Sequence, residues 1–406
     1  MRVAETSLPL PPSVTVAVAL RTTTERLAQE LANPQRATPE WSPFEWRAAR
    51  AVAAMHGISG LLAGRLLWVG ARGWREFLVA QREHIARRNA RLREFLGTVA
   101  ERFQSQGIPV QALKGAALWP LGLYTEGERP MADLDLLVRV QDTRHAGDIL
   151  EDLGLRESHR TVKHRVFEAR EGTVAPFGEH ADNRMKVELH ERICEPLPHR
   201  LTDISHLVLP RDAHPGLNPY PSRAALMAHL LLHAGGGMAY RTLRLIQLHD
   251  IALLAHRMTQ QDWRELQDWT PWWAWPPLAL AQRYYGAIAP QTVMASTRAY
   301  CQPVLRRTCA RQRLSDVSLS HLWLEAFPGI EWARSIGEAL TFAARRVVPS
   351  GEVLSDRKFA VRTDPSLAVG DWGALSQGRR IIRALSRRTA RPWPLHNVRA
   401  ALAQPR

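Results

Sequence analysis

Lysine is scarce in this 406-residue sequence, because it occurs only at positions 114, 163, 186 and 358 while arginine supplies the rest of the 54 basic residues. The formal net charge of +15 suits a protein that binds phosphates. The excess of arginine over lysine is nevertheless more easily ascribed to a GC-rich coding sequence than to selection for phosphate contacts. Nucleic acid is therefore an open but not a favoured partner.

Cysteines and long apolar runs are also few. Cys194, Cys301 and Cys309 are odd in number and lack metal-site spacing, which favours a reduced, cytoplasmic compartment. No run of about 18 uncharged apolar residues is present to span a bilayer. The apolar stretch at 8–20 contains prolines and ends at Arg21 rather than at a small-residue cleavage site. We therefore expect a cytoplasmic protein without a signal peptide or a transmembrane segment.

What remains is the composition of a globular protein, with 45% hydrophobic and 23% charged residues. Apolar residues at three- and four-residue intervals predict helices in the first hundred positions, and the period shortens to two afterwards. We predict an α+β fold with a short mixed sheet and flanking helical regions. The predicted parts are an N-terminal helical region (1–100), a mixed core (101–212), a helical domain (213–345) and a basic C-terminal extension (346–406).

The predicted core contains alternating strand patterns separated by helical or turn segments. The segment 142–155 is predicted to be a helix that Gly154 helps to end. The segments 165–169 and 185–193 are expected to form a pair of antiparallel strands. Strands are predicted within 108–115, 132–140, 165–169 and 185–193.

Two aspartates stand two positions apart in the otherwise apolar run RPMADLDLLV at 129–138. In a strand, residues i and i+2 project to the same face, so Asp133 and Asp135 point together. Two negative charges about 4 Å apart repel by roughly 4 kcal/mol at an effective dielectric near 20. A cation removes this conflict, and carboxylate oxygens with room for water and phosphate suit Mg²⁺. We predict that these two aspartates bind Mg²⁺.

A third acid lies on a later predicted strand. In MKVELHERI, alternation puts Lys186, Glu188 and His190 on one face. If this strand pairs beside the first, Glu188 approaches the two aspartates. Three carboxylates on neighbouring strands can hold two metal ions, which stabilise the incoming and departing oxygens of phosphoryl transfer. We predict that Glu188 completes this site or takes the proton of the attacking hydroxyl.

Phosphate contacts are predicted just upstream of the acids. In ALKGAAL, Lys114 and Gly115 stand where a strand passes into a helix, and backbone N–H groups at a helix N-terminus attract phosphate. Gly115 lets the chain approach closely, and Lys114 adds a positive charge. Arg129, just before the acidic strand, has a planar fork that matches phosphate oxygens.

Together, LKGAAL (113–118), RPMADLDLLV (129–138) and VELH (187–190) resemble an uncharacterised bacterial nucleotidyltransferase family of the DNA polymerase β-like superfamily. The superfamily signature is a Gly-Ser or similar turn, a helix, Asp-x-Asp or Asp-x-Glu on a strand, and a third acid on a later strand. The resemblance covers about 108–192, and LRLIQLHDIALL at 243–254 is similar to the Leu-x-Asp helix that follows. Here the turn is Lys-Gly-Ala, and the third acid is glutamate.

The resemblance implies a polymerase-β-like core, metal ligation by Asp133, Asp135 and Glu188, and phosphate contacts near Lys114 and Gly115. It implies a Mg²⁺-dependent enzyme that moves a nucleoside monophosphate from an NTP, such as ATP, to a small-molecule or peptide acceptor. An alternative hypothesis is a catalytically degenerate member that binds a peptide or nucleic acid through its basic surface. A third hypothesis places the enzyme in specialised metabolism, like the antibiotic-adenylating relatives.

His229 and His233 lie four apart on a predicted helix, a spacing that can bind zinc. They lack the adjacent glutamate of the H-E-x-x-H motif, so we expect hydrogen-bonded or cleft-lining histidines instead. Asp250 follows a histidine on the next helix and could orient a neighbouring group or face the cleft.

The tryptophan-rich segment 269–277 could stack a base, although its prolines favour a packed connection between helices. After about residue 345, thirteen basic residues stand against four acidic ones. We expect this tail to be a solvated or partly disordered extension. Binding to RNA, to an acidic peptide or to an anionic membrane surface is the alternative.

Overall fold

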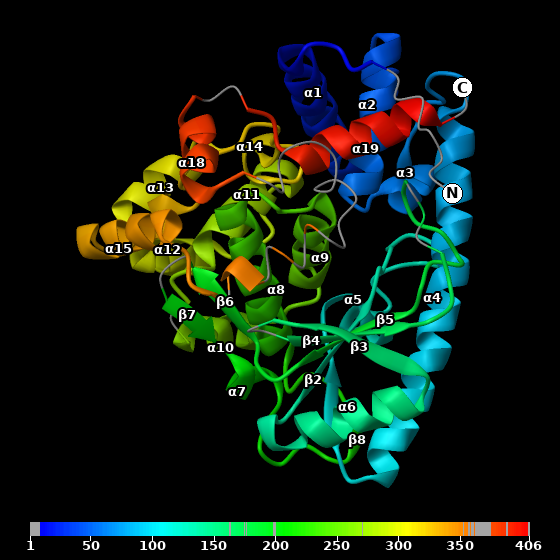
Figure 1. Cartoon of the computed structure of the whole chain (residues 1–406), viewed down its shortest axis with the longest axis vertical. Coiled ribbons are helices and arrows are strands. Elements are labelled where there is room, and N and C mark those ends of the chain that lie inside the picture. Colours follow the sequence, from blue (N-terminus) through cyan, green and yellow to red (C-terminus); the bar gives the residue numbers. More distant parts are fainter. Residues whose placement is uncertain are drawn as a thin grey trace.

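The computed structural model describes residues 9–404, except 162–163, 174, 176, 198–199, 270, 352, 356–357, 359–360, 362–374 and 387–388. Its first part is helical, as the apolar spacing predicts. The long helix α4 runs along one side of the molecule (Figure 1). The four helices are α1 (Ser13–Ala32), α2 (Pro43–Met55), α3 (Ser59–Arg65) and α4 (Trp74–Ser105).

A mixed six-stranded sheet follows α4, with the strand order β3-β4-β5-β2-β1-β8. Strand β2 runs parallel to β5, and β1 runs parallel to β8, whereas the other neighbours are antiparallel. The predicted antiparallel pairing of the last two strands is confirmed as β4 with β5. The strands are β1 (Pro109–Ala112), β2 (Leu134–Val138), β3 (Leu155–Arg160), β4 (His164–Ala169), β5 (Lys186–His190) and β8 (Gly216–Asn218).

Short helices and one hairpin connect these strands. Pro120 lies in a 3₁₀ turn rather than in the preceding α-helix, because proline cannot donate an α-helical hydrogen bond. Gly154 follows α6 with φ +89°, a conformation that suits glycine after a helix. The elements are α5 (Lys114–Leu118), η1 (Trp119–Leu121), η2 (Val140–Asp142), α6 (Thr143–Asp152), β6 (Cys194–Leu197), β7 (Arg200–Asp203) and α7 (Ser205–Val208).

The two faces of the sheet have different surroundings. Leu134, Leu136 and Val138 of β2 belong to a buried cluster with residues of α4 and α6. Leu137 belongs instead to the cluster of the helical region. Alternation therefore turns Asp135, which lies two residues from Leu137, toward the helical region.

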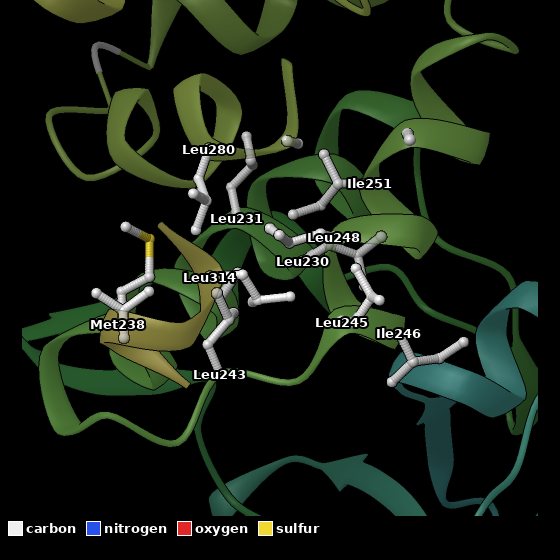
Figure 2. Close-up of a cluster of buried hydrophobic side chains, with 14 of the residues drawn as sticks. Leu230, Leu231, Met238, Leu243, Leu245, Ile246, Leu248, Ile251, Leu280 and Leu314 are labelled. Carbon is white, nitrogen blue, oxygen red and sulfur yellow. The ribbon is translucent and has the colours of Figure 1, made fainter. Parts of the chain in front are cut away.

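The helical region packs around α8, which is buried on nearly all sides. Leucine and isoleucine side chains from α8, α9, α11 and α14 meet there (Figure 2). The elements are α8 (Arg223–Tyr240), α9 (Leu245–Ala255), α10 (Gln260–Asp268), α11 (Trp275–Tyr285), α12 (Gln291–Tyr300), α13 (Pro303–Cys309), α14 (Leu314–Val317), η3 (Ile330–Trp332) and α15 (Ile336–Val347). The predicted α+β class, a mixed sheet flanked by helices, is confirmed.

The C-terminal part holds α18 (Gln377–Leu385) and α19 (Pro392–Ala403), and α19 packs across α2 (Figure 1). Val398 and Ala401 are fully buried there, and Arg47 donates a hydrogen bond of 2.6 Å to the Gln404 carbonyl. The expectation of a solvated tail is wrong for α19, because its apolar face is needed to cover the N-terminal helices. The basic residues at 357, 362, 387, 388 and 406 lie outside the described residues.

The tryptophan-rich segment is packed rather than presented to solvent. Trp273 and Trp275 are buried, and Trp272 meets Trp332 edge-on with ring centroids 6.3 Å apart. This arrangement agrees with the packed connection that the prolines favour. Among the helices in the described part of the chain, none combines the length and the apolarity needed to cross a membrane.

Candidate active site

The three predicted acids come together on the face of the sheet that is turned toward α8. The parallel register of β2 and β5 places Asp135 directly beside Glu188. Asp133 stands just before β2, and its side chain is 25% exposed, against 7% for Asp135. Lys186 links the group, because its Nζ lies 3.3 Å from Asp133 Oδ2 and 2.6 Å from Glu188 Oε1.

Asp135 is the most tightly paired of the three acids. Lys114 Nζ donates a hydrogen bond of 2.6 Å to Asp135 Oδ1, and His190 Nε2 lies 3.0 Å from the same oxygen. Burial alone would raise the pKa of Asp135, but the Lys114 ammonium and the His190 contact hold it well below its ordinary value. Asp135 is therefore ionised at every physiological pH.

Asp133 has the opposite environment, although it belongs to the same motif. Burial and the charges of Asp135 and Glu188 raise the pKa of Asp133 to about 7, against the pull of Lys186. Burial and Asp135 would also raise the pKa of Glu188, but Lys114 and Lys186 lower it below its ordinary value. Three carboxylates thus share two ammonium groups, and Asp133 is the acid that takes up a proton most readily.

Lys114 and Gly115 border the acids at the start of α5. Lys114 has φ +47°, a left-handed conformation that is strained for a residue with a side chain. A Cβ on Gly115 would lie 2.1 Å from Arg129 Nη1 and 2.8 Å from Met131 Sδ. Any side chain at position 115 would therefore collide with the guanidinium of Arg129, and this collision, rather than the backbone angles, explains the glycine.

Arg129 binds a carboxylate of the next helix. Its Nε and Nη2 donate hydrogen bonds of 2.8 and 2.7 Å to the two oxygens of Asp250, and Tyr124 also donates to Asp250. Burial would lower the pKa of Arg129, but Asp250 raises it above its ordinary value. Asp250 thus both faces the cleft and orients a neighbour, the two roles considered for it.

The predicted phosphate contacts of Lys114 and Arg129 stay predictions, because each side chain binds a carboxylate in the structure.

Arg244 is a cleft residue that sequence reasoning missed. It directly precedes α9, and its Nε donates a hydrogen bond of 3.0 Å to the Met55 carbonyl. A Cβ on Gly57, which has φ +66°, would lie 2.7 Å from Arg244 Nη2. Within the described ranges no carboxylate lies at ion-pair distance from Arg244, and burial lowers the pKa of its guanidinium. The guanidinium is thus a cation with room for an anionic partner.

Two adjoining cavities share Lys114 and His233. The first, here called the carboxylate cavity, is about 190 Å³, and its polar lining residues are Lys114, Gly115, Arg129, Asp133, Asp135, His233, Arg244, Gln247 and Asp250. The second, here called the histidine cavity, is about 200 Å³, and its polar lining residues are Lys114, His164, Glu188, His190, Arg192, Glu195, His229 and His233.

Histidines dominate the second cavity. Burial lowers the pKa of His164 to about 4, and burial likewise lowers the pKa values of His229 and His233. His229 Nδ1 lies 2.7 Å from the Tyr220 hydroxyl, and His233 Nδ1 lies 3.4 Å from Glu195 Oε1. These two are hydrogen-bonded, cleft-lining histidines, as the sequence leads us to expect. His164 was not predicted, although His190 was placed on the face of Glu188.

The donor set at the acids fits a hard divalent cation. Carboxylate oxygens are the ligands that Mg²⁺ prefers. The raised pKa of Asp133 reflects in part repulsion from Asp135 and Glu188, which a bound cation would reduce. In the described part of the chain, His164, Glu188 and His190 form a group of three whose ligand atoms lie within 4.8 Å of one another. The aspartates are not part of that group, so their metal ligation stays a prediction.

An α+β core with acids on adjacent strands of a mixed sheet is the arrangement of a nucleotidyltransferase domain. The model of a family described as uncharacterised nucleotidyltransferases matches residues 42–271, so the chain belongs to this family. The matched stretch contains every residue that lines the two cavities. No curated protein and no solved structure matches the chain.

Proposed function

We propose that the protein is a Mg²⁺-dependent nucleotidyltransferase that moves a nucleoside monophosphate from an NTP to a hydroxyl of a small molecule or peptide. One observation carries this proposal: the parallel register of β2 and β5 puts Asp135 beside Glu188, with Lys186 joining Glu188 to Asp133. Asp133, Asp135 and Glu188 would hold the cation. When bound, Mg²⁺ would neutralise charge on the phosphates.

The carboxylate cavity is the proposed triphosphate site. Arg244 has no carboxylate partner in the described part of the chain and lines this cavity together with Lys114. The planar fork of Arg244 would bind phosphate oxygens, and Lys114 would add positive charge between the two cavities. Arg129, fixed by Asp250, would keep the floor of the site rigid beside Gly115.

The histidine cavity is the proposed acceptor site. Glu188 turns Oε2 toward His164 and His190, and its lowered pKa leaves it ionised near neutral pH. The acceptor oxygen would form a bond to the α-phosphorus while the bond from that phosphorus to the bridging oxygen breaks. Pyrophosphate would leave with the electron pair, and Glu188 would take the hydroxyl proton and pass it to solvent.

A screen for pyrophosphate release tests this proposal. The purified protein is incubated with Mg²⁺ or Mn²⁺, each NTP and pools of hydroxyl acceptors. We expect acceptor-dependent release that falls by about 10³-fold in Asp133→Asn, because the cation that would neutralise the transition state loses a ligand. Asp148→Asn, on the exposed side of α6, is the matched control and should react like the wild type. Equal turnover by wild type and Asp133→Asn would contradict the proposal.

A non-catalytic binding protein is the second candidate. The observation that favours it is that Lys114 and Lys186 already pair with the acids. Metal-dependent NTP binding is therefore measured alongside turnover. Binding of NTP without pyrophosphate release from any acceptor pool would favour this second candidate.

A further inference from the structure

Three metal-ligating side chains meet on two antiparallel strands beside the proposed catalytic acids. The register of β4 and β5 places His164 directly opposite His190. Glu188 lies two residues before His190 and therefore on the same face. All three side chains line the histidine cavity. This convergence comes from backbone pairing, so it does not depend on any one rotamer.

The distances among the three side chains are close to those of a coordination shell. His164 Nε2 and His190 Nε2 lie 3.6 and 3.9 Å from Glu188 Oε2, and metal binding would replace the present contact of 3.0 Å between His190 Nε2 and Asp135 Oδ1. Ligands bound to one tetrahedral ion at 2.0–2.1 Å are separated by about 3.3 Å, so contractions of roughly 0.3 to 0.6 Å suffice. The two imidazole rings stand 4.9 Å apart.

Glu188 uses its two oxygens for different neighbours. Oε1 accepts a hydrogen bond of 2.6 Å from Lys186, on the side of Asp133, while Oε2 faces the two histidines. His164 Nδ1 is buried and has no hydrogen-bond partner in the described part of the chain. Since no hydrogen bond in the described part of the chain fixes the proton of His164 on one ring nitrogen, Nε2 can carry the lone pair that a metal needs.

We propose that His164, Glu188 and His190 form a second cation site, which binds a divalent metal that favours imidazole ligands, such as Zn²⁺ or Co²⁺, rather than Mg²⁺. Imidazole nitrogens favour such metals, whereas Mg²⁺ prefers oxygen donors alone. Three protein ligands leave at least one position open, toward the cavity that we assign to the acceptor. The site shares Glu188 with the proposed function, but its metal preference follows from the two imidazoles.

Cobalt absorption tests the site without any nucleotide, so its outcome is independent of catalysis. Metal-free protein is titrated with Co²⁺, and visible absorption is recorded together with the bound metal after equilibrium dialysis. We expect one Co²⁺ with the strong absorption of a low-coordinate nitrogen-containing site. His164→Ala and His190→Ala should lose this absorption and weaken binding by at least about tenfold.

Three further variants make the result specific. His164→Gln gives a second substitution at the same position, and circular dichroism checks that each variant folds. Asp133→Asn should keep the cobalt signal, because Asp133 contributes to the other cation site. His84→Ala is the matched control, since His84 and His180 form another close histidine pair with ring centroids 4.3 Å apart. The proposal is overturned if wild type binds no Co²⁺, or if folded His164 and His190 variants keep the signal.

Discussion

The two cavities on either side of Lys114 balance their charges in different ways. The carboxylate cavity contains full charges of both signs, held as ion pairs such as Lys114 with Asp135 and Arg129 with Asp250. In the histidine cavity, burial lowers the pKa values of His164, His229 and His233, so these three imidazoles are neutral near pH 7, although Lys114, Glu188 and Arg192 also line the cavity. The comparison shows that one face of the sheet carries a site dominated by ion pairs next to a site dominated by imidazoles, and we propose the first for the triphosphate and the second for its acceptor.

The two arginines of the carboxylate cavity repeat this contrast on a smaller scale. Arg129 is fixed by two hydrogen bonds to Asp250, whereas Arg244 has only a backbone carbonyl as its side-chain partner in the described residues. Arg129 is thus part of the fixed structure of the site, whereas Arg244 has donors left for a ligand. The predictions below test these differences.

The largest effect is expected from Asp250→Asn, which leaves the buried Arg129 guanidinium without its counter-charge. Removing one partner of a buried ion pair typically costs about 3–5 kcal/mol. The free energy of unfolding in urea measures this loss. The exposed Asp148→Asn control should stay within about 0.5 kcal/mol of the wild type. A change below about 1 kcal/mol in Asp250→Asn would show that Arg129 does not need this partner.

Arg244→Gln tests whether the carboxylate cavity, and not the histidine cavity, binds the NTP. Hydrogen bonds to a charged group contribute about 1.5–3 kcal/mol, so we expect the Kd for NTP to rise by roughly 10- to 100-fold. Fluorescence or calorimetric titration with NTP and Mg²⁺ provides the measurement. His229→Asn, in the histidine cavity, should change that Kd by less than about twofold. Equal losses in both variants would mean that the cavities do not divide the substrates.

A pH dependence of stability is expected from Asp133. Its folded-state pKa of about 7 lies above its unfolded value, so the folded state binds the proton more strongly between about pH 4 and 7. This contribution is complete at low pH and is lost as the pH rises through 7. From pH 5 to pH 8, wild type should therefore lose about 2 kcal/mol relative to Asp133→Asn. Parallel stability curves for the two proteins would rule out the raised pKa.

The smallest effect concerns the left-handed backbone of Lys114. Lys114→Gly and Lys114→Ala both remove the ammonium, but only glycine adopts φ +47° without strain. We expect the glycine variant to be about 1 kcal/mol more stable than the alanine variant. Thermal unfolding of the pair measures the difference. Equal stability would mean that the backbone relaxes when the Asp135 ion pair is lost.

The alternation of β2 and β5 was enough to predict which side chains share a face. Asp135 and Glu188 lie where the period of two places them, because one face of each strand is buried in the sheet core, whereas Asp133 stands just before β2. The parallel pairing of β2 with β5 could only be assumed, since β3 and β4 intervene in the sequence. The end of the helix near Gly154 followed from local chemistry.

Side-chain partners could not be predicted in the same way. Lys114 and Arg129 were recognised as cations near the site, but their carboxylate partners depend on how α5 and α9 pack. Arg244 and His164 were missed because each reaches the cleft through tertiary packing or strand pairing. A signal existed for both, since Arg244 lies in the segment 243–254 and His164 directly precedes the segment 165–169, which was expected to pair with the strand of Glu188.

Calorimetric titration of nucleotide with and without Mg²⁺ tests most directly whether the acids act together. A non-hydrolysable analogue of each NTP is titrated into wild type, Asp133→Asn and the Asp148→Asn control. Our account predicts that wild type and the control bind an analogue tightly only with Mg²⁺, and that Asp133→Asn loses the metal-dependent part. Nucleotide binding that is equally tight without Mg²⁺, or unchanged in Asp133→Asn, would contradict it.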